Sequence, residues 1–316
     1  MATGPLEQST ITVEAVPTAD EAGLYIALDN GYFKQEGLTV KVTPINGGEY
    51  GMTDLQSGKA DIVAGNYVSF ILAQIQKSFH NKSINIRIIA DGSQMQPGNQ
   101  AVYVMPSSKF KTVADLAKYH ATVLINSPNN IGQVLLGSLF SQNGLDLKTA
   151  VKQLVIPDFF TQVQDLGTGK IVDGEPVDAA WLPEPFGTIA QETYGAVPLA
   201  DFDQGALQNF PIGAYIGTDA WVTSHPNTVA AFLRALEEGQ EVADTNRSQV
   251  ELALEKNTGV NSLQAATMTI DSYPLAMDIP TMQRVSDEMY AFGLEPGLPK
   301  PYQIINMVQP EPGMIR

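Results

Sequence analysis

A local pattern that occurs twice constrains the fold of this chain more than any other feature. The first copy, residues 54–66, runs from a predicted helix through Gly58 and a tight turn that contains Asp61 into a short apolar strand. The second copy starts at Asp165, passes through Gly169 and a short insert, and continues into a strand at residues 178–181. A helix that stops at glycine and returns to a buried strand is typical of α/β units. Two copies therefore predict two similar α/β lobes with a cleft between them.

Predicted strands and helices alternate along most of the chain. Strands are expected at residues 11–16, 39–42, 62–64, 84–89, 101–105, 121–125, 151–156, 178–181, 196–199 and 213–222. Helices are expected at residues 21–28, 67–77, 131–142, 183–194 and 226–244, among others. This alternation is typical of a mostly parallel sheet that is covered by helices on both faces, so the fold class is α/β.

Composition excludes several classes of function. The 316-residue chain has a formal net charge of −16 at pH 7, which would repel nucleic acid and anionic membrane surfaces. It has no cysteine, which excludes disulfides, thiolate catalysis and cysteine-ligated metals. No apolar run reaches the roughly 18 residues that a membrane-spanning helix needs. The polar residues 1–10 contain no signal peptide. They are either what remains after removal of a signal or lipid anchor, or a native cytosolic N-terminus.

The sequence contains none of the common catalytic motifs. It has no dinucleotide-binding glycine fingerprint, phosphate-binding loop, serine elbow or zinc-protease motif. The spacing in Gly167-Thr168-Gly169 differs from that of the dinucleotide fingerprint, and this segment ends a helix instead of starting one. We therefore expect no catalytic residues, no metal ligands and no cofactor.

The better candidates for function are polar and aromatic residues at the carboxyl ends of predicted strands, where ligands bind in open α/β sheets. This rule selects the segments 17–18, 66–67, 91–93, 126–127, 158–159 and 181–184. Asn126 and Ser127 precede a helix, so they either form a capping turn or hold a polar ligand group. Aromatic residues at these ends either belong to the core or form a platform for a flat ligand. Glu184 either faces solvent, caps a helix or binds a ligand amine.

Several segments carry a family resemblance. The first segment is a spaced pattern made of Ala27, Gly31-Tyr32-Phe33, Glu36-Gly37-Leu38 and Val40. The other two are Leu55-Gln56-Ser57-Gly58-Lys59-Ala60-Asp61 and Trp181-Leu182-Pro183-Glu184-Pro185. Together these residues resemble the substrate-binding proteins of ABC importers for sulfonates, taurine, nitrate and the pyrimidine precursor of thiamine. The similarity spans residues 11–244.

The resemblance implies a two-lobe type II periplasmic-binding-protein fold that closes on a small-molecule ligand in the cleft. Lobe I would comprise residues 1–100 with 201–316, and lobe II residues 101–200. The protein would be monomeric and extracytoplasmic, either periplasmic or a lipoprotein that touches the membrane only through its lipid anchor. Its partners would be ABC permease subunits. Positions matched to the family and the residue-level arguments together give these ligand-binding candidates: Thr18, Asn66, Tyr67, Ser93, Asn126, Ser127, Asp158, Phe159, Trp181 and Glu184.

The class of ligand follows from charge. No candidate loop contains Arg or Lys, which disfavours a strong anion, whereas acidic and aromatic residues favour a neutral or cationic ring such as an aminopyrimidine. A sulfonate-, taurine- or nitrate-type anion stays open, because helix N-termini alone bind anions. Some family relatives are pyrimidine-forming enzymes that rely on a cysteine cluster, and the absence of cysteine argues against that chemistry here. An enzyme of the pyrimidine-synthesis type that uses a His, a carboxylate or a metal instead of cysteine is the alternative to a receptor. A sensory domain is a third alternative.

Overall fold

A computed structural model describes residues 4–76, 78–79 and 82–308, and these form two compact units. Unit 1 comprises Met1–Gln94, Pro211–Gly259 and Ser272–Arg316, and unit 2 comprises Met95–Phe210 and Val260–Asp271. The division predicted from sequence, at residues 100 and 200, assigns residues 95–100, 201–210 and 260–271 to the first lobe instead. Backbone and side-chain contacts explain the difference. Phe202 N–H donates to the Gln100 carbonyl (3.1 Å), and the Asn99 amide donates to Asp271.

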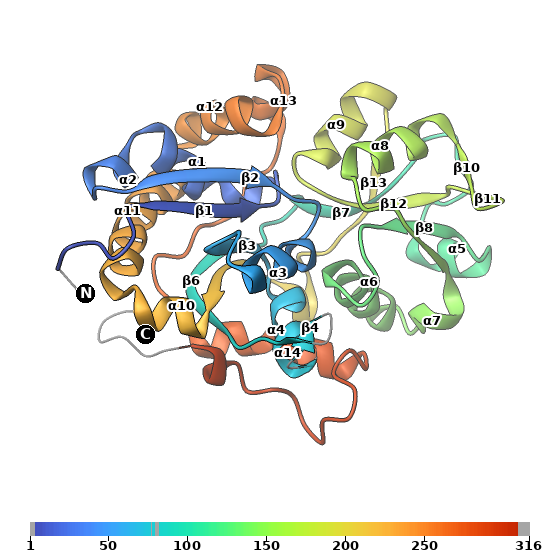
Figure 1. The fold of residues 1–316 in the computed structure, drawn as a ribbon. Helices are drawn as coiled ribbons and strands as arrows, with labels where there is room; N and C mark the ends of the chain where they lie inside the picture. The colour runs from blue at the N-terminus through green and yellow to red at the C-terminus, as the bar shows by residue number, and fades with distance from the viewer. Residues whose placement is uncertain (1–3, 77, 80–81, 309–316) are drawn as a thin grey trace. The chain divides into compact units, whose positions relative to one another are not determined.

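Unit 1 is built on a five-stranded sheet in the order β2-β1-β3-β14-β6 (Figure 1). Its strands are β1 (Thr10–Ala15), β2 (Thr39–Pro44), β3 (Ile62–Asn66), β6 (Ile86–Gln94) and β14 (Pro211–Thr218). β1 runs parallel to β2 and β3, while β14 runs antiparallel to β3 and β6. The carboxyl ends of four strands and the amino end of β14 therefore meet at one edge.

Helices cover both faces of the unit 1 sheet. Successive side chains of a strand point to opposite faces of the sheet. Val13 therefore faces the core that α1 (Ala22–Asp29) and α11 (Pro226–Thr245) cover. In this core the Phe33 and Phe232 rings stack at 5.2 Å. Glu14 faces the other side and α3 (Gly48–Ser57), where a Cβ on Gly51 would lie 3.2 Å from Glu14 Oε2. The remaining elements are α2 (Tyr32–Gln35), α4 (Tyr67–Gln76), α10 (Asp219–Ser224), α12 (Arg247–Thr258), α14 (Ile279–Ala291), the 3₁₀ turns η1 (Ala19–Glu21) and η3 (Ile304–Met307), and the hairpin β4 (Ser78–Phe79) with β5 (Lys82–Ser83).

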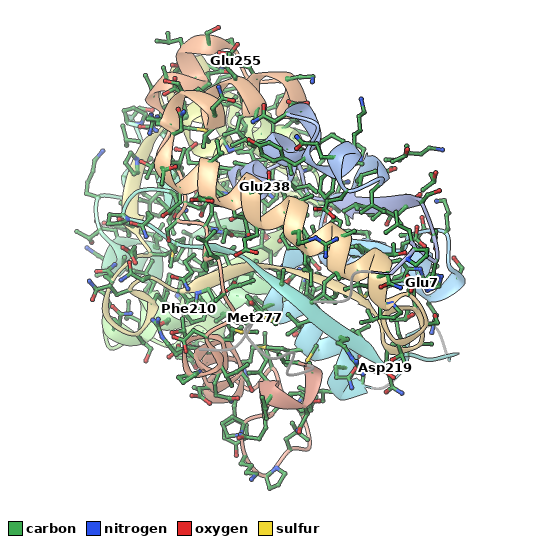
Figure 2. The ribbon with its side chains drawn as sticks, turned by 90° about the vertical axis from the view of Figure 1, so that its left-hand side faces the viewer. Glu7, Phe210, Asp219, Glu238, Glu255 and Met277 are labelled. Atoms are coloured by element: carbon green, nitrogen blue, oxygen red, sulfur yellow. The ribbon has the colours of Figure 1, made fainter. Side chains whose placement is uncertain are left out.

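The long helix α11 begins against an acidic side chain. Glu7 lies near its first turn (Figure 2) and accepts hydrogen bonds from the Thr228 N–H (2.9 Å) and hydroxyl (3.0 Å). Although partial desolvation opposes it, hydrogen bonding from Thr228 and Asn227 lowers the pKa of Glu7 to about 2. The carboxylate thus satisfies N–H groups that have no partner inside the helix.

Unit 2 has its own five-stranded sheet, in the order β13-β7-β12-β8-β9 (Figure 1). Its strands are β7 (Gln100–Val104), β8 (Thr122–Ile125), β9 (Lys152–Val155), β12 (Ala179–Pro183) and β13 (Val197–Asp201). β8 runs parallel to β9 and β12, and β7 runs antiparallel to β12 and β13. The other elements are α5 (Val113–Lys118), α6 (Ile131–Gln142), α7 (Leu147–Ala150), α8 (Phe159–Thr168), α9 (Phe186–Tyr194), α13 (Ser262–Thr267), η2 (Gly205–Leu207) and the hairpin β10 (Ile171–Val172) with β11 (Glu175–Pro176).

The two sheets share one topology. If only the four mutually parallel strands of each unit are counted in chain order, the second lies outermost, followed by the first and the third, then the antiparallel strand and finally the fourth. β14 is the antiparallel strand in unit 1, and β7 is the antiparallel strand in unit 2. The expected mostly parallel α/β sheet with flanking helices is thus confirmed in each unit.

The repeated sequence pattern forms the same turn twice. Gly58 and Gly169 both adopt left-handed φ angles, of 75° and 63°, which glycine adopts without steric cost. After each glycine, a lysine N–H closes the helix end: Lys59 on the Asp54 carbonyl (2.9 Å) and Lys170 on the Asp165 carbonyl (3.0 Å).

The aspartate of each copy then joins the third strand of its unit to the first. Asp61 Oδ2 accepts from the Thr12 N–H at 2.8 Å in unit 1, and Asp178 Oδ2 accepts from the Thr122 N–H at 3.0 Å in unit 2. The predicted repeat is therefore a structural repeat, since matching residues make matching contacts.

Some predicted boundaries are wrong. The strand expected at residues 84–89 extends to Gln94, because β6 pairs with β14 as far as Pro211, so segment 91–93 lies inside a strand instead of a loop. The strand expected at residues 213–222 ends at Thr218, whose hydroxyl caps α10 by accepting from the Trp221 N–H. The strand expected at residues 178–181 continues to Pro183, so Trp181 lies inside β12 instead of at its end, and the helix expected from residue 183 starts at Phe186. Within the described residues, no helix combines the length and apolar composition needed to cross a membrane.

Candidate functional site

At the carboxyl edge of the unit 1 sheet, the strand register brings two predicted site residues close together. Gly213 of β14 pairs with Asn66 of β3 on one side and with Ser93 of β6 on the other. Thr18 follows β1 and precedes η1 at the same edge. All three predicted polar residues are buried.

A carboxylate that the sequence analysis did not select, Asp20, links two of these residues. The Thr18 hydroxyl donates to Asp20 Oδ2 at 2.7 Å, and the Ser93 hydroxyl donates to Asp20 Oδ1 at 3.0 Å. The Ser93 oxygen in turn accepts from the Gly213 N–H at 3.2 Å. Asp20 is half-buried, so its carboxylate belongs to the surface of this edge. The sequence could have pointed to Asp20, because it lies two residues after Thr18 and just before a helix.

Asn66 and Tyr67 have structural partners. Asn66 Oδ1 accepts from the Ser69 N–H at 3.0 Å and so caps α4. The Tyr67 side chain is fully buried, and its hydroxyl donates to Asp91 Oδ1 at 2.9 Å. Burial raises the pKa of Asp91 to about 7, against the hydrogen bonds from Tyr67 and Gly92 that lower it. Gln240 of α11 secures the same strand, because its amide donates to the Asp91 and Gly92 carbonyls.

In unit 2, the segment after β8 contains both a cap and two buried candidates. The cap of α6 is Asn130, whose Oδ1 accepts from the Ile131 N–H at 2.7 Å. Asn126 and Ser127 are buried just before it. The Ser127 hydroxyl lies 3.4 Å from the Pro128 carbonyl oxygen. The capping function at this turn thus belongs to Asn130, four residues after Asn126.

The aromatic candidates of unit 2 form one cluster. The Phe159 ring stacks on Phe186 at 5.0 Å and meets Trp181 edge to face at 5.6 Å. The Trp181 indole N–H donates to Gln100 Oε1 at 3.1 Å, and the indole is 2% exposed. Phe160 packs edge-on against Phe186 and is 46% exposed, which makes it the exposed member of the cluster.

The two acidic candidates of unit 2 both bond N–H groups in the first turn of a helix. Asp158 accepts from the N–H groups of Phe160 and Thr161 at 3.3 and 3.1 Å, at the start of α8. Glu184 is buried and accepts from the N–H and hydroxyl of Thr188 at 3.0 and 2.9 Å, in the first turn of α9. Burial raises the pKa of Glu184 to about 7, although the hydrogen bonds from Thr188 oppose that shift.

These contacts determine which hydrogen-bonding groups at the strand ends are available to a ligand. Each helix that follows β3, β8, β9 or β12 has its N-terminus covered by a side chain of the chain itself: Asn66, Asn130, Asp158 and Glu184. An anion at these termini would lie beside an amide or carboxylate oxygen that already takes part of the N–H groups. Among the described residues, no three His, Asp or Glu side chains come together in a group that could hold a metal ion.

Comparison with known proteins places the chain in a family. The profile of the NMT1-like family matches residues 4–254. The chain belongs to the NMT1-like family. No curated protein matches this NMT1-like chain.

Solved structures share its fold. The alkanesulfonate-binding protein SsuA from Xanthomonas axonopodis pv. citri, bound to MOPS, matches with a TM-score of 0.77 and 16% identity, covering 96% of this chain and 99% of that one. The periplasmic nitrate-binding protein NrtA from Synechocystis PCC 6803 matches at 0.72 and 17%, covering 83% and 70%. The desulfurization enzyme DszB matches at 0.70 and 15%, covering 96% and 97%. The predicted periplasmic-binding-protein fold is thereby confirmed for this NMT1-like protein.

Proposed function

We propose that this chain is the extracytoplasmic solute-binding receptor of an ABC importer, with permease subunits as its partners. Membership of the NMT1-like family and a fold shared with two proteins that are named as binding proteins support this function. DszB has the same fold and is named as an enzyme, so the fold alone is compatible with catalysis. The absence of cysteine favours the receptor over a pyrimidine-forming enzyme of the cysteine-dependent kind.

The proposed ligand is a small ring compound with N–H donors, such as an aminopyrimidine. The observation that carries this choice is that side-chain oxygen atoms of the chain already accept from N–H groups at the helix N-termini that follow the strand ends. The segments that contain the candidate residues include no Lys or Arg. A surface rich in acceptor oxygens complements donors and opposes anions.

A sulfonate- or nitrate-type anion is the second candidate, and the comparisons fit it about equally well. Two of the structurally similar proteins are named for binding alkanesulfonate and nitrate. In such a complex the donors would be the Ser127 hydroxyl, the Asn126 amide and backbone N–H groups.

The proposed contacts lie at the strand ends of both units. In unit 1 they are Thr18, Asn66, Tyr67 and Ser93, and in unit 2 they are Asn126, Ser127, Asp158, Phe159, Trp181 and Glu184. Since Tyr67 and Trp181 are buried and hydrogen-bonded, they would contact a ligand only through ring edges or by local repacking. Phe160, which is exposed, adds an accessible ring to this set.

Thermal-shift and calorimetric titration against a panel of solutes tests the receptor function. The panel contains an aminopyrimidine, a cationic amidine, taurine, an alkanesulfonate and nitrate. A ligand that binds only the native state adds about 2.7 kcal/mol of stability at one hundred times its Kd, so Tm rises with its concentration. A panel that leaves Tm unchanged while a protein partner raises it would contradict the proposal, as would turnover of a pyridoxal-type substrate.

A further inference from the structure

Unit 1 contains a small cavity beside β6, the edge strand of its sheet. The cavity has a volume of about 70 Å³ and is lined by residues of β6 and α11 and by residues 274–277, of which Met277 is labelled in Figure 2. None of its lining residues belongs to the proposed solute contacts, so it is a separate site. Because one water molecule needs about 10–15 Å³, the cavity has room for a chain of about five heavy atoms.

The walls of this cavity are mostly apolar. Ile89 of β6 and Leu233 and Leu236 of α11 line it, and all three side chains are buried. Leu275 also lines it but is 50% exposed, so the cavity is open to solvent there. Apolar walls of this size with an opening fit an unbranched hydrocarbon chain.

Two buried acceptors also line the cavity. Asp91 is 2% exposed, and its Oδ1 accepts from the Tyr67 hydroxyl at 2.9 Å and from the Gly92 N–H at 3.1 Å. Its Oδ2 is buried and has no hydrogen-bond partner among the described residues. The Gln240 amide donates to the Asp91 and Gly92 carbonyls, which fixes its orientation and leaves its oxygen as an acceptor. A buried acceptor without a donor is costly, so a donor in this cavity would be stabilising.

The charge of the lining favours a cation. Asp91 and Glu237 both line the cavity, while none of its described lining residues is Lys, Arg or His. Burial raises the pKa of Asp91 to about 7, and the neighbouring charge of Asp278 acts in the same direction. A cation would offset both effects, because it stabilises the ionised carboxylate.

The same residues do not suit a metal ion. No three His, Asp or Glu side chains of the described chain form a group that could hold one. Calcium and magnesium need six or more oxygen ligands, whereas an ammonium group needs three acceptors for its three N–H donors. The side chains of Asp91, Gln240 and Glu237 supply acceptors of that number beside apolar walls.

From these observations we infer that this cavity is a second binding site, which takes the ammonium group of a primary alkylamine with its hydrocarbon chain. The ammonium donates to Asp91 Oδ2 and to the Gln240 amide oxygen, and Glu237 adds negative charge at the exposed rim. The chain of the amine packs against Leu233 and Leu236. The amine is either a free small molecule or the side chain of a lysine in a partner, since both present the same chemistry.

An NMR titration of the nitrogen-15-labelled protein tests the site with n-butylamine. We expect saturable shifts of the Gln240 and Met277 amide signals with a Kd of about 1–10 mM. 1-Butanol has the same chain length without the charge and should bind at least about 10-fold more weakly. Butyrate, which carries the opposite charge, should not bind. Sodium chloride at the same ionic strength is the control for screening.

Variants separate the carboxylate from the rest of the cavity. Asp91→Asn keeps an acceptor for Tyr67 and Gly92 but replaces Oδ2 with an amide N–H₂ group. It should weaken butylamine at least about 10-fold and leave the affinity for butanol unchanged. Glu237→Gln should weaken butylamine less, and the matched change Glu238→Gln, next to it on α11 (Figure 2), should change no Kd. If Asp91→Asn loses its native circular dichroism, the exposed Glu237 provides the comparison with butanol.

The outcomes also distinguish the two sources of the amine. Tighter binding of N-acetyl-lysine amide than of butylamine would assign the site to a lysine side chain, and the reverse order to a free amine. The inference is overturned if butylamine gives no saturable shifts, if butanol binds as tightly as butylamine, or if Asp91→Asn binds butylamine like the wild type. None of these results depends on solute binding at the strand ends, so the proposed receptor function is tested separately.

Discussion

Buried carboxyl groups with raised pKa values distinguish this protein at the scale of single residues. Burial raises the pKa of Glu21 to about 8 and those of Asp91 and Glu184 to about 7. The folded state thus keeps protons that the unfolded chain releases above its ordinary carboxyl pKa. Because the unfolded state binds fewer protons between about pH 4.5 and 8, the free energy of unfolding falls as pH rises through that range.

Glu21 offers a direct test of this linkage. In Glu21→Gln the amide oxygen can still accept from Tyr215, but the side chain no longer titrates. We expect Tm to fall less steeply between pH 5 and 8 in this variant than in the wild type. Differential scanning calorimetry across that range measures the slope. Glu238→Gln, which changes an exposed glutamate, should keep the wild-type slope, and an unchanged slope in Glu21→Gln would refute the assignment.

Gly132 shows how one missing side chain shapes the aromatic cluster. A Cβ at this position would lie 2.7 Å from Trp181 Cε3. Gly132→Ala should therefore displace the indole, weaken its bond to Gln100, and destabilise the protein by about 1–3 kcal/mol. Urea unfolding together with tryptophan fluorescence measures both effects. Ser141→Ala, at an exposed position of α6, should stay within about 0.5 kcal/mol. Wild-type stability and emission in Gly132→Ala would mean that the ring has room to move.

At the scale of elements, the aspartate of the repeated turn joins the third strand to the first. Asp178→Ala would leave the buried Thr122 N–H without its acceptor, at a cost of about 1–3 kcal/mol. Asp178→Asn keeps an acceptor oxygen and should cost less. Chemical denaturation of both variants measures the difference. Equal stability of Asp178→Ala and the wild type would show that water replaces this contact.

The cap of α8 separates structural from ligand-binding contributions of Asp158. Loss of the cap in Asp158→Ala should cost about 1 kcal/mol without any ligand, whereas asparagine caps nearly as well as aspartate. Stability of Asp158→Asn should thus stay close to wild type. Any change in solute Kd in that variant then reports ligand contact, as the proposed function expects. Loss of stability in Asp158→Asn would instead show that the charge, not the cap oxygen, matters for the helix.

The boundaries of helices and strands could be predicted from the sequence where neighbouring residues determine them. α6 spans Ile131–Gln142 as predicted, and α5 starts at a capping box of Thr112 and Asp115, a signal that lies within four residues. β6 was predicted too short, because its last residues, including Asp91 and Ser93, are polar and their strand conformation comes from pairing with β14. Pairing partners more than a hundred residues away leave no local signal.

At the scale of the whole molecule, acidic residues outnumber basic ones by 34 to 18. Self-repulsion of like charges destabilises the compact state, and salt screens it. We expect Tm to rise by several degrees between about 10 and 200 mM NaCl, in thermal-shift measurements at constant pH. Equal ionic strengths of sodium fluoride serve as the control for specific chloride binding. A Tm that falls with salt would mean that the ion pairs of the chain outweigh its repulsion.

The structural similarity of the two units could also be anticipated in part. The repeat predicted that residues 54–66 and 165–181 occupy equivalent places, and each leads into the third strand of its sheet. It did not predict that residues 260–271 join unit 2. That assignment depends on contacts such as Asn99 with Asp271, which join residues far apart in the chain and follow no local pattern.

The sequence by itself determined the α/β class, the two copies of the helix–glycine–strand turn, and the strand ends as the place to look for a site. Those features depend on periodicity and turn chemistry, which act over a few neighbouring residues. Only the tertiary structure decided that Asn66, Asn130, Asp158 and Glu184 close helix N-termini, and that Asp20 lies between the Thr18 and Ser93 hydroxyls. The orientation of a polar side chain depends on which distant strand supplies its hydrogen-bond partner, and this is settled when the sheet forms.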